Sequence, residues 1–513
     1  MNSKITLFTA GMGLIVSASV FSKQKPNIVF IMSDDHAYQA ISAYGSDLNE
    51  TPNIDRIAKE GALFTKAFVT NSLSGPSRAA ILTGKYSHLN GKIDNQQPEY
   101  NWDQQNFVRI LQENGYQTAM VGKIHIPGQP QGFDYTNILP GQGLYYNPQF
   151  IENGVKKPYP GYVTTLTTQF ALDWLNDKRD KSKPFCILLH QKAPHSNWQA
   201  ETKYLELYED KVFEVPDNFY DDFSERSTGA KNQNIQITRN MEWGKILKFE
   251  IDPVTGKKTP FSRDLERQLN PEQLAAWRAA YNPKNEAFLN NPPQSRELDK
   301  WKFNRYIRDY LKCIKSVDDG VGEVLDYLKE NGLEENTIVV YTSDQGFFLG
   351  EHGWYDKRFM YEESLRTPFM IRYPKEIKAG TVSDKMILNI DYASTFLDYA
   401  GIKIPKDMQG ESFRKIVNGK STSWRDAIYY HYYEYPKPRL VMPHYGVRTE
   451  RYKLIHFYGE IDEWELYDLE KDPREMHSVY GDPAYAKVRV QMHKQLKALQ
   501  KKYKDQQPEA QLN

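Results

Sequence analysis

The sequence predicts an α/β fold, in which a doubly wound, mostly parallel sheet precedes a small antiparallel subdomain with a closing helix. The main observation is a set of short apolar runs that are rich in branched side chains and bounded by polar, Pro or Gly residues. Buried parallel strands have this pattern. Four such runs carry the prediction: Asn27–Met32, Thr118–Val121, Phe185–His190 and Thr337–Tyr341.

Helical patterns separate these runs, and strands that alternate with helices indicate a doubly wound sheet. The helical patterns span residues 53–61, 102–115, 164–175 and 304–330. A polar segment, 226–300, interrupts the alternation. We expect it to be an insertion that lies over the sheet, with one helix beginning at Asn270, and we assign it no chemistry.

From about Arg425 the pattern changes to short, aromatic-rich runs that are typical of antiparallel strands. These runs span 427–433, 445–449, 452–457 and 465–469, and residues 483–502 predict the closing helix. We therefore expect a catalytic domain at 23–415 and a C-terminal subdomain at 416–513.

Charge and composition bear on partners and location. The chain has 66 basic and 66 acidic side chains, so its net charge gives no reason to expect nucleic acid as a partner. Residues 1–22 predict a secretory signal peptide, because Lys4 precedes an apolar stretch that ends in small residues. No other run approaches the ~20 apolar residues of a membrane span. We expect a periplasmic or secreted protein.

The chain has two cysteines, Cys186 and Cys313. They could pair in an exported protein, but one possible bridge is not a disulfide framework. Cys186 lies inside an apolar run, which favours a buried, free thiol.

The segment Ser74–Lys85 carries the most specific motif, Ser-Gly-Pro-Ser-Arg followed by Leu-Thr-Gly. Pro76 suits the first turn of a helix, and Gly84 stands where a C-cap glycine belongs. Ser74 would then lie just outside a helix N-terminus, where backbone N–H groups and the helix dipole favour an anion. Arg78, one turn along, could reach back to an oxyanion.

Polar side chains follow all four apolar runs, at the strand ends where ligands bind in open α/β sheets. Lys123 and His125 follow the second run, and His195 follows the third. The first and last runs are followed by oxygen donors alone, which suit a hard cation, Ca²⁺ before Mg²⁺. These predicted metal ligands are Asp34, Asp35, Asp344 and Gln345.

The motif at Ser74 resembles the signature of the formylglycine-dependent sulfatases, whose fold is alkaline-phosphatase-like. In that family the first residue of the motif is oxidised to an aldehyde, and the aldehyde hydrate attacks sulfur. The resemblance therefore implies that Ser74 becomes formylglycine (3-oxoalanine). It also implies Ca²⁺ at the four oxygen donors, with Gln345 where the family usually has Asn. Serine-type motifs resemble those that a radical-type sulfatase-maturating enzyme modifies in bacteria.

The resemblance assigns roles to further residues. Gly122-Lys123-Ile124-His125 is similar to the second sulfatase signature, which implies contacts with the formylglycine and the sulfate. His195 matches the histidine that protonates the leaving alcohol, a role that suits a histidine near neutral pH. Lys357 matches the lysine that grips sulfate. With three aspartates, Ca²⁺ and three basic side chains including Arg78, the site would carry about +2 and attract a sulfate monoester.

Two segments resemble the N-acetylglucosamine-6-sulfatase branch, namely Asp356-Lys357-Arg358 and 442–448. Asp356 and Arg358 flank the sulfate lysine and could bind sugar hydroxyls, and His444 could reach in from the C-terminal subdomain. Each of the three could equally be a surface charge or a strand-end histidine. The expected substrate is 6-O-sulfated N-acetylglucosamine in host-type glycans such as mucin or glycosaminoglycans.

Other functions stay open at this point. The chain could be a sulfatase for another sugar position, such as a 2-O-sulfated uronate, or a phosphodiesterase or phosphonate hydrolase of the same superfamily. It could also be a sugar-binding protein whose Ser74 is never modified. Cleavage of sulfate and phosphate esters of one alcohol separates the enzymes, and the chemical state of Ser74 separates the binding protein.

Overall fold

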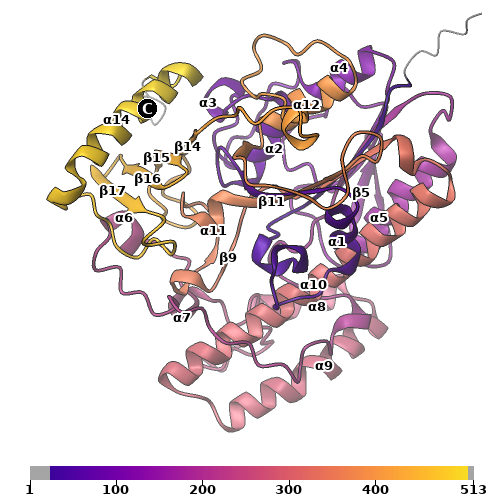
Figure 1. Ribbon diagram of the computed structural model, residues 1–513. Coiled ribbons are helices and arrows are strands. Elements are labelled where there is room, and N and C mark those ends of the chain that lie inside the picture. Colours follow the sequence, from indigo (N-terminus) through magenta and orange to yellow (C-terminus); the bar gives the residue numbers. More distant parts are fainter. Residues whose placement is uncertain (1–23, 507–513) are drawn as a thin grey trace, which may run out of the picture.

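The computed structural model describes residues 24–506 (Figure 1). The predicted signal peptide, 1–22, lies outside these residues. The centre of the molecule is an 11-stranded sheet with the order β12-β2-β11-β8-β1-β7-β3-β4-β5-β6, and β13 pairs with β2. The strands are β1 (Asn27–Ser33), β2 (Ala62–Phe68), β3 (Gln117–Gly122), β4 (Tyr135–Ile138), β5 (Gln149–Glu152), β6 (Val155–Pro158), β7 (Phe185–His190), β8 (Thr337–Ser343), β11 (Arg366–Arg372), β12 (Thr381–Ser383) and β13 (Ile387–Leu388).

The four predicted strands form the middle of this sheet. They lie side by side in the order β8-β1-β7-β3, and all of their pairings are parallel. Ile28 in β1 stands opposite Cys186 on one side and Ile338 on the other. Because all seven residues of β1 are buried, the strand reads as a continuous apolar run. The predicted fold class is confirmed.

Helices cover both faces of the sheet, and alternate side chains of β1 point to different faces. Val29 and Ile31 belong to the core beneath α1 (Pro52–Lys59), α5 (Val163–Asp173) and α10 (Ser295–Glu330). Ile28 and Phe30 belong to the core beneath α2 (Ser74–Thr83), α4 (Phe107–Glu113) and α12 (Asp391–Tyr399). The remaining short helices are α3 (Ser87–Asn90), α6 (Thr228–Lys231), α7 (Ile237–Asn240), α11 (Glu362–Leu365) and α13 (Arg414–Val417).

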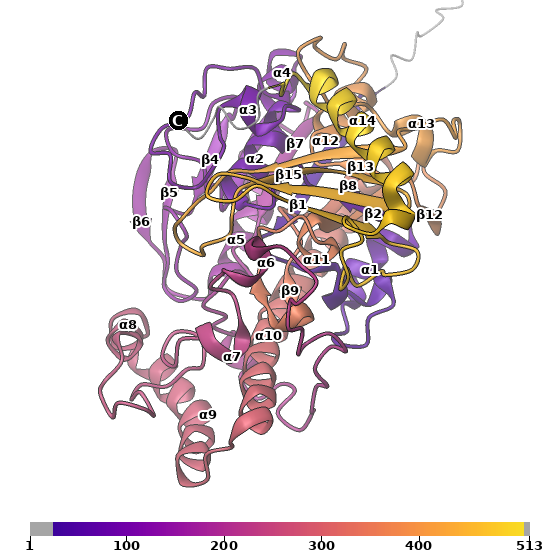
Figure 2. The ribbon, with the colours of Figure 1, turned by 90° about the vertical axis from the view of Figure 1, so that its left-hand side faces the viewer.

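The insertion differs from its expected position. Its helices α8 (Pro260–Gln268) and α9 (Pro271–Asn290) lie beside the first half of α10 and not over the sheet (Figures 1 and 2). α9 begins as predicted, with a capping box formed by Asn270 and Gln273. Its inner face holds aromatic residues that pack on α10, such as Phe288, whose ring centroid is 4.4 Å from that of Trp301. This apolar face draws the insertion to the long helix.

The C-terminal subdomain is a four-stranded antiparallel sheet with one helix against it, as predicted. Its elements are β14 (Ala427–Tyr432), β15 (His444–Thr449), β16 (Tyr452–Phe457), β17 (Glu463–Asp468) and α14 (Ala486–Tyr503). β14 contacts the turn before α2, because His431 N donates to Thr70 O at 3.0 Å and Ser72 N donates to the Tyr430 hydroxyl at 3.2 Å. The subdomain therefore supports the segment that carries Ser74.

Two further findings concern the sequence predictions. Cys186 and Cys313 are both buried and free. Within residues 24–506, no helix is long and apolar enough to cross a membrane.

Candidate active site

Ser74 lies at the start of α2, in the interior of the protein. All ten residues of α2 are buried. Ser74 is the first residue of the helix, whereas we expected it to lie just outside the helix N-terminus. Gly84 ends the helix in the left-handed conformation, with φ 65°. The Ser74 hydroxyl donates a hydrogen bond to Asp34 Oδ1 at 3.2 Å. Ser74 is therefore next to the first of the predicted metal ligands.

The four predicted oxygen donors lie together at the carboxyl ends of the neighbouring strands β1 and β8. Asp35 N donates to Asp344 Oδ1 at 3.1 Å, and Gln345 Nε2 donates to Asp35 Oδ1 at 2.5 Å. All four residues are at most 1% exposed. The buried Gln345 Oε1 has no hydrogen-bond partner among residues 24–506, although buried polar atoms are usually paired.

Basic side chains surround these carboxylates. Arg78 Nη2 lies 3.2 Å from Asp34 Oδ2 and 3.0 Å from Asp344 Oδ2. Lys123 forms an ion pair with Asp34. Lys357 Nζ lies 2.6 Å from both carboxylate oxygens of Asp35. Each acidic side chain is thus held by a cation, as buried charges require.

The acidic groups disturb one another's titration. Burial raises the pKa of Asp35 to about 7; Lys357 opposes this shift, and the charges of Asp34, Asp344 and Asp356 add to it. The pKa of Asp344 is raised by burial and by Asp34. Burial alone would raise the pKa of Asp34 too, but Lys123, His195 and Arg78 hold it well below its usual range. Carboxylates crowded in this way favour a further cation.

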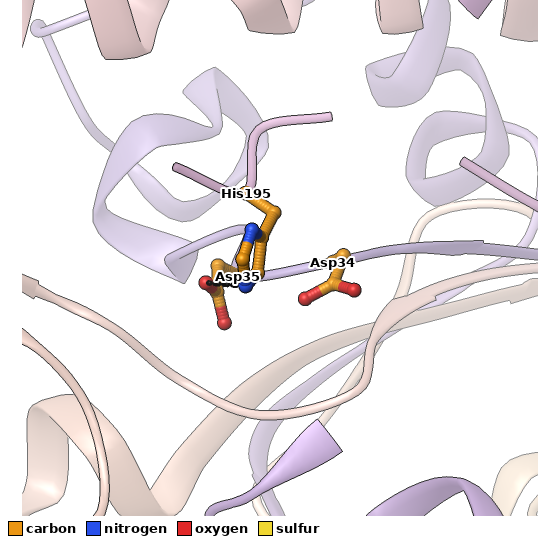
Figure 3. Close-up of side chains that lie close together, drawn as sticks. All are labelled: Asp34, Asp35 and His195. Atoms are coloured by element: carbon orange, nitrogen blue, oxygen red, sulfur yellow. Dashed lines mark ion pairs between the residues drawn. The ribbon is translucent and has the colours of Figure 1, made fainter. Parts of the chain in front are cut away.

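The donor set fits a hard cation. Three carboxylates and an amide oxygen without a partner supply oxygen ligands only, and the Lys357 ammonium now occupies the position of a cation beside Asp35. A different set, Asp34, Asp35 and His195, also brings ligand atoms within 4.8 Å of one another (Figure 3). We favour the oxygen set, because Asp344 and Gln345 contact Asp35 directly, whereas His195 Nε2 stays 3.8 Å from Asp35 Oδ2.

His195 presents one ring nitrogen to the site. Its Nδ1 donates to the carbonyl oxygen of Ser196 at 2.7 Å, so Nδ1 carries the proton in the neutral ring and Nε2 is free to exchange one. The Tyr145 hydroxyl donates to the His195 carbonyl at 2.5 Å and fixes the backbone there. Burial and the charge of Lys123 hold the pKa of His195 well below its usual value. An anion bound nearby would raise it again.

Lys123 and His125 are joined by a residue that the sequence analysis missed. Gln142 accepts a hydrogen bond from Lys123 Nζ at 2.5 Å, and its Nε2 lies 2.9 Å from His125 Nε2. Gln142 is on an exposed turn between Gly141 (φ 56°) and Gly143 (φ 67°). The two glycines could have indicated a turn here, but nothing in the sequence places that turn at the site.

A cavity of about 160 Å³ opens beside these groups. It is lined by Asp35, His195, Ser196, Trp198, Phe347, Tyr355, Asp356, Lys357, Arg358, Pro438 and Arg439. Asp356 and Arg358 flank the predicted sulfate lysine with φ of 88° and 96°. Such conformations cost non-glycine residues about 1–3 kcal/mol each and concentrate at functional sites.

Two of the three predicted substrate ligands line the cavity, and the third does not. Asp356 and Arg358 face the cavity, and Asp356 Oδ1 accepts hydrogen bonds from Arg358 Nη1 at 2.5 Å and Lys357 N at 2.9 Å. His444 does not face it. The ring of His444 is fully buried, with Nδ1 2.8 Å from the Met442 carbonyl and Nε2 accepting from Met360 N at 3.1 Å. The structure corrects the expected role of His444, because both ring nitrogens are already engaged by backbone groups, Nδ1 by the Met442 carbonyl and Nε2 by Met360 N.

Family models match the chain in two overlapping parts. The model described as "Sulfatase" matches residues 26–402, and the model described as "N-sulphoglucosamine sulphohydrolase, C-terminal" matches residues 350–502. The chain belongs to the sulfatase family. It is a sulfuric ester hydrolase, as predicted from the motif at Ser74.

Two relatives with named activities agree with this family. The chain is 46% identical to an N-acetylglucosamine-6-O-sulfatase of Bacteroides thetaiotaomicron over 95% of its own length and 88% of the relative's. It is 28% identical to the human N-acetylglucosamine-6-sulfatase, over 80% and 67% of the two chains.

Solved structures show the same relationship. One structure, described as a complex with its substrate D-glucosamine-2-N,6-O-disulfate, has a TM-score of 0.91 and 46% identity, and the match covers 94% of this chain and 99% of that one. A phosphonate monoester hydrolase of Agrobacterium radiobacter, with a TM-score of 0.66 and 19% identity over 93% and 96% of the chains, shares the fold alone. The phosphonate hydrolase alternative therefore rests on fold similarity only.

Proposed function

We propose that this sulfatase removes the 6-O-sulfate of N-acetylglucosamine in glycan chains. The observation that carries the proposal is the Asp356-Lys357-Arg358 segment, whose three side chains line one small cavity beside the metal ligands. The 46% identity to an N-acetylglucosamine-6-O-sulfatase supports it. A lysine that fixes the sulfate also determines where the neighbouring sugar hydroxyls lie, so its flanking residues can read the sugar.

We further propose that Ser74 is converted to formylglycine and that Asp34, Asp35, Asp344 and Gln345 hold Ca²⁺. The hydrated aldehyde would supply the oxygen nucleophile, and the cation would supply positive charge for the oxygens around sulfur. The Ser74 side chain lies against Asp34, so both groups would meet at one place. A cation bound at Asp35 would free Lys357 for the sulfate.

The remaining side chains can bind the sulfate and move one proton. Lys123 and Lys357 supply positive charge close to Asp34 and Asp35, where a sulfate ester would carry its negative charge. His195 Nε2 faces the cavity and would give a proton to the sugar oxygen that leaves. The bound sulfate would raise the pKa of His195 toward the range in which the ring is protonated.

Asp356 has room for one sugar hydroxyl. A carboxylate offers about four acceptor positions, and the side chain accepts three hydrogen bonds, from Arg358 Nη1, Lys357 N and Arg439 Nε. Burial alone would raise its pKa, but Arg358 and Arg439 keep the pKa well below the usual range. Asp356 therefore stays ionised, and we propose that its remaining position binds the 4-hydroxyl of the sugar.

Export and maturation complete the proposal. The pattern of residues 1–22 supports a periplasmic or secreted enzyme, and the serine-type motif supports modification by a radical-type maturating enzyme. A protein outside the cell would meet mucin or glycosaminoglycan fragments as substrates.

A panel of sulfated sugars tests the proposed substrate. The panel holds 6-O-sulfated N-acetylglucosamine, its galactosamine epimer, a 2-O-sulfated uronate, and the 6-phosphate ester of N-acetylglucosamine. We expect the first to give the highest kcat/KM, because a site that binds a hydroxyl rejects the inverted one. Equal rates on the two epimers would leave a carbohydrate sulfatase of other specificity, and preference for the uronate or the phosphate would reject the proposal.

A further inference from the structure

Arg439 lines the active-site cavity, and the sequence motifs assign it no role. It lies in the segment between β14 and β15 and lines the cavity together with Pro438. Its Nε donates to Asp356 Oδ2 at 2.7 Å, and its guanidinium lies 5.4 Å from the ring centroid of Tyr355. The position of this side chain is therefore fixed by two residues of the cavity wall.

The outer edge of this guanidinium is free. Nη1 makes one long contact, 3.4 Å to the Tyr355 hydroxyl, and Nη2 has no hydrogen bond within the part of the chain that the structure describes. The Arg439 side chain is 25% exposed, whereas Lys357 and Arg358 are each 7% exposed. Among the cavity's cations, Arg439 is the one that reaches the opening.

The charges around Arg439 leave this edge electropositive. On the inner side, Arg358 lies between Asp356 and the buried Glu434, whose Oε2 is 3.5 Å from Arg358 Nε. Arg358 thereby balances part of both carboxylates, and Arg439 contacts Asp356 through Nε. A planar guanidinium with one long contact at Nη1, and with no hydrogen bond at Nη2 among the described residues, suits a sulfate or carboxylate.

The backbone of Arg439 is anchored by the insertion. Asn234 N donates to the Arg439 carbonyl at 2.9 Å, and Tyr355 N donates to the Ile235 carbonyl at 2.9 Å. The Tyr355 hydroxyl also donates to the Asn240 carbonyl at 3.1 Å. Residues 234–240 therefore hold both Arg439 and the ring beneath it, so the guanidinium is preorganised for a ligand.

We propose that Arg439 is a specificity-determining residue that binds a second anionic group of the substrate, besides the sulfate that is removed. This inference rests on the proposed 6-O-sulfatase function and narrows its substrate class to polyanionic glycans. The second anion is a sulfate on the same ring or the carboxylate of a neighbouring uronic acid, since both present oxygens to an arginine fork in the same way.

Kinetics on four substrates with matched variants test this inference. The substrates are 6-O-sulfated N-acetylglucosamine, the 2-N,6-O-disulfated and 3-O,6-O-disulfated forms of the sugar, and a disaccharide in which the 6-O-sulfated residue is linked to a uronic acid. The variant Arg439→Gln keeps a hydrogen-bond donor for Asp356 but removes the charge. The variant Lys437→Gln removes a charge from the same segment at an exposed residue that does not line the cavity.

For the wild-type enzyme we expect kcat/KM to be roughly ten-fold higher on at least one doubly anionic substrate than on 6-O-sulfated N-acetylglucosamine, the order of a charged hydrogen bond. Arg439→Gln should abolish that preference, because it should lower kcat/KM more on the doubly anionic substrate than on the singly sulfated sugar, and Lys437→Gln should retain it. The preferred substrate identifies the source of the anion. The preference should also shrink as salt is raised, because Arg439 is partly exposed.

Two results would overturn the inference while leaving the proposed function intact. One is equal wild-type rates on all four substrates. The other is an equal loss for Arg439→Gln on all four, which would mean that Arg439 only positions Asp356. If the wild-type enzyme cleaves none of the four, the proposed 6-O-sulfatase function itself fails.

Discussion

Asp356 connects the fold to the proposed chemistry through a single side chain. Its carboxylate joins Arg358 and Arg439, which come from different segments, and its backbone turns through a strained conformation beside Lys357. Such strain persists only where surrounding contacts over-determine it. We infer that the contacts of Asp356 keep Lys357 and Arg358 aimed into the cavity.

Removing the charge of Asp356 or that of Arg358 should therefore reduce the enzyme's discrimination between sugars. We expect Asp356→Ala to lower kcat/KM on 6-O-sulfated N-acetylglucosamine roughly 10- to 100-fold, because the buried Arg358 and the partly exposed Arg439 lose their acceptor. Arg358→Ala should act similarly, and both should lose most of the preference over the galactosamine epimer. Asp264→Ala, which breaks an exposed pair with Arg267 on α8, is the matched control. An unchanged preference in both site variants would refute the assignment.

Gln345 and its acidic neighbours predict dependence on a metal. Exhaustive chelation with EGTA should abolish turnover, and Ca²⁺ should restore it better than Zn²⁺, because the donors are oxygens only. Ca²⁺ should also raise the unfolding temperature of the wild-type protein, since a ligand that binds only the folded state stabilises it. Asp344→Ala should show neither response. Full turnover by the chelated enzyme would remove the cation from the account.

Strand-end residues were predictable from the sequence, and side chains delivered by other segments were not. Asp34 and Asp344 follow the ends of two apolar runs within three residues, so parallel pairing alone places them at one edge. Gln142 and Arg439 arrive from turns whose course depends on distant contacts, such as the bond from Asn234 to Arg439. His444 was misassigned because its position in the sequence does not reveal that both ring nitrogens face inward.

Asp505 is a buried carboxylate that supports the contact between the C-terminal subdomain and the turn before Ser74. Asp505, just after α14, accepts from the Tyr429 hydroxyl at 2.7 Å and lies 2.8 Å from His431 Nδ1. Burial alone would raise the pKa of Asp505, but the hydrogen bond and charge of His431 bring the pKa below its usual value. Because β14 also contacts Thr70 and Ser72, Asp505 stabilises the strand that supports the turn before Ser74.

Asp505→Asn should lower the free energy of unfolding at pH 7 by about 1–3 kcal/mol, the cost of weakening buried hydrogen bonds. A carboxylate with a depressed folded-state pKa stabilises above its unfolded pKa, about 3.9, and that stabilisation is lost as the pH falls. The gap between wild type and variant should therefore narrow below about pH 4. Denaturant titrations at several pH values measure it, and a gap that is constant down to pH 3 would contradict the role of Asp505.

Among the larger elements, the periodicity of the sequence predicted the regular strands but missed strands whose pairing depends on distant segments. The four central strands and the antiparallel sheet were predicted from apolar runs and turns. β2 and β11 were missed, although they extend the sheet beside β8, because β11 is antiparallel to both neighbours and contains Pro368. The insertion was expected over the sheet, but the aromatic face of α9 packs against α10. The mixed polar composition of α9 hides this face in the sequence.

The chain as a whole has balanced charge, but many charged side chains are concentrated at the candidate active site. The 66 basic and 66 acidic side chains cancel. Buried in one place, however, Arg78, Lys123 and Lys357 surround three carboxylates within a low-dielectric interior. These six charges cancel, and the proposed Ca²⁺ would bring the site to about +2, so a neutral protein could bind a small anion there without attracting polyanions over its entire surface.

The most direct test joins the chemical state of Ser74 to sulfate release. Protein from the native source is divided: mass spectrometry measures the fraction of the Ser74 peptide that has lost two hydrogen atoms, and the rest is assayed on 6-O-sulfated N-acetylglucosamine. Sulfate release should rise in proportion to the converted fraction across preparations and vanish in Ser74→Ala. Undiminished release by protein whose Ser74 is entirely unmodified, or none by fully converted protein with Ca²⁺, would contradict the account.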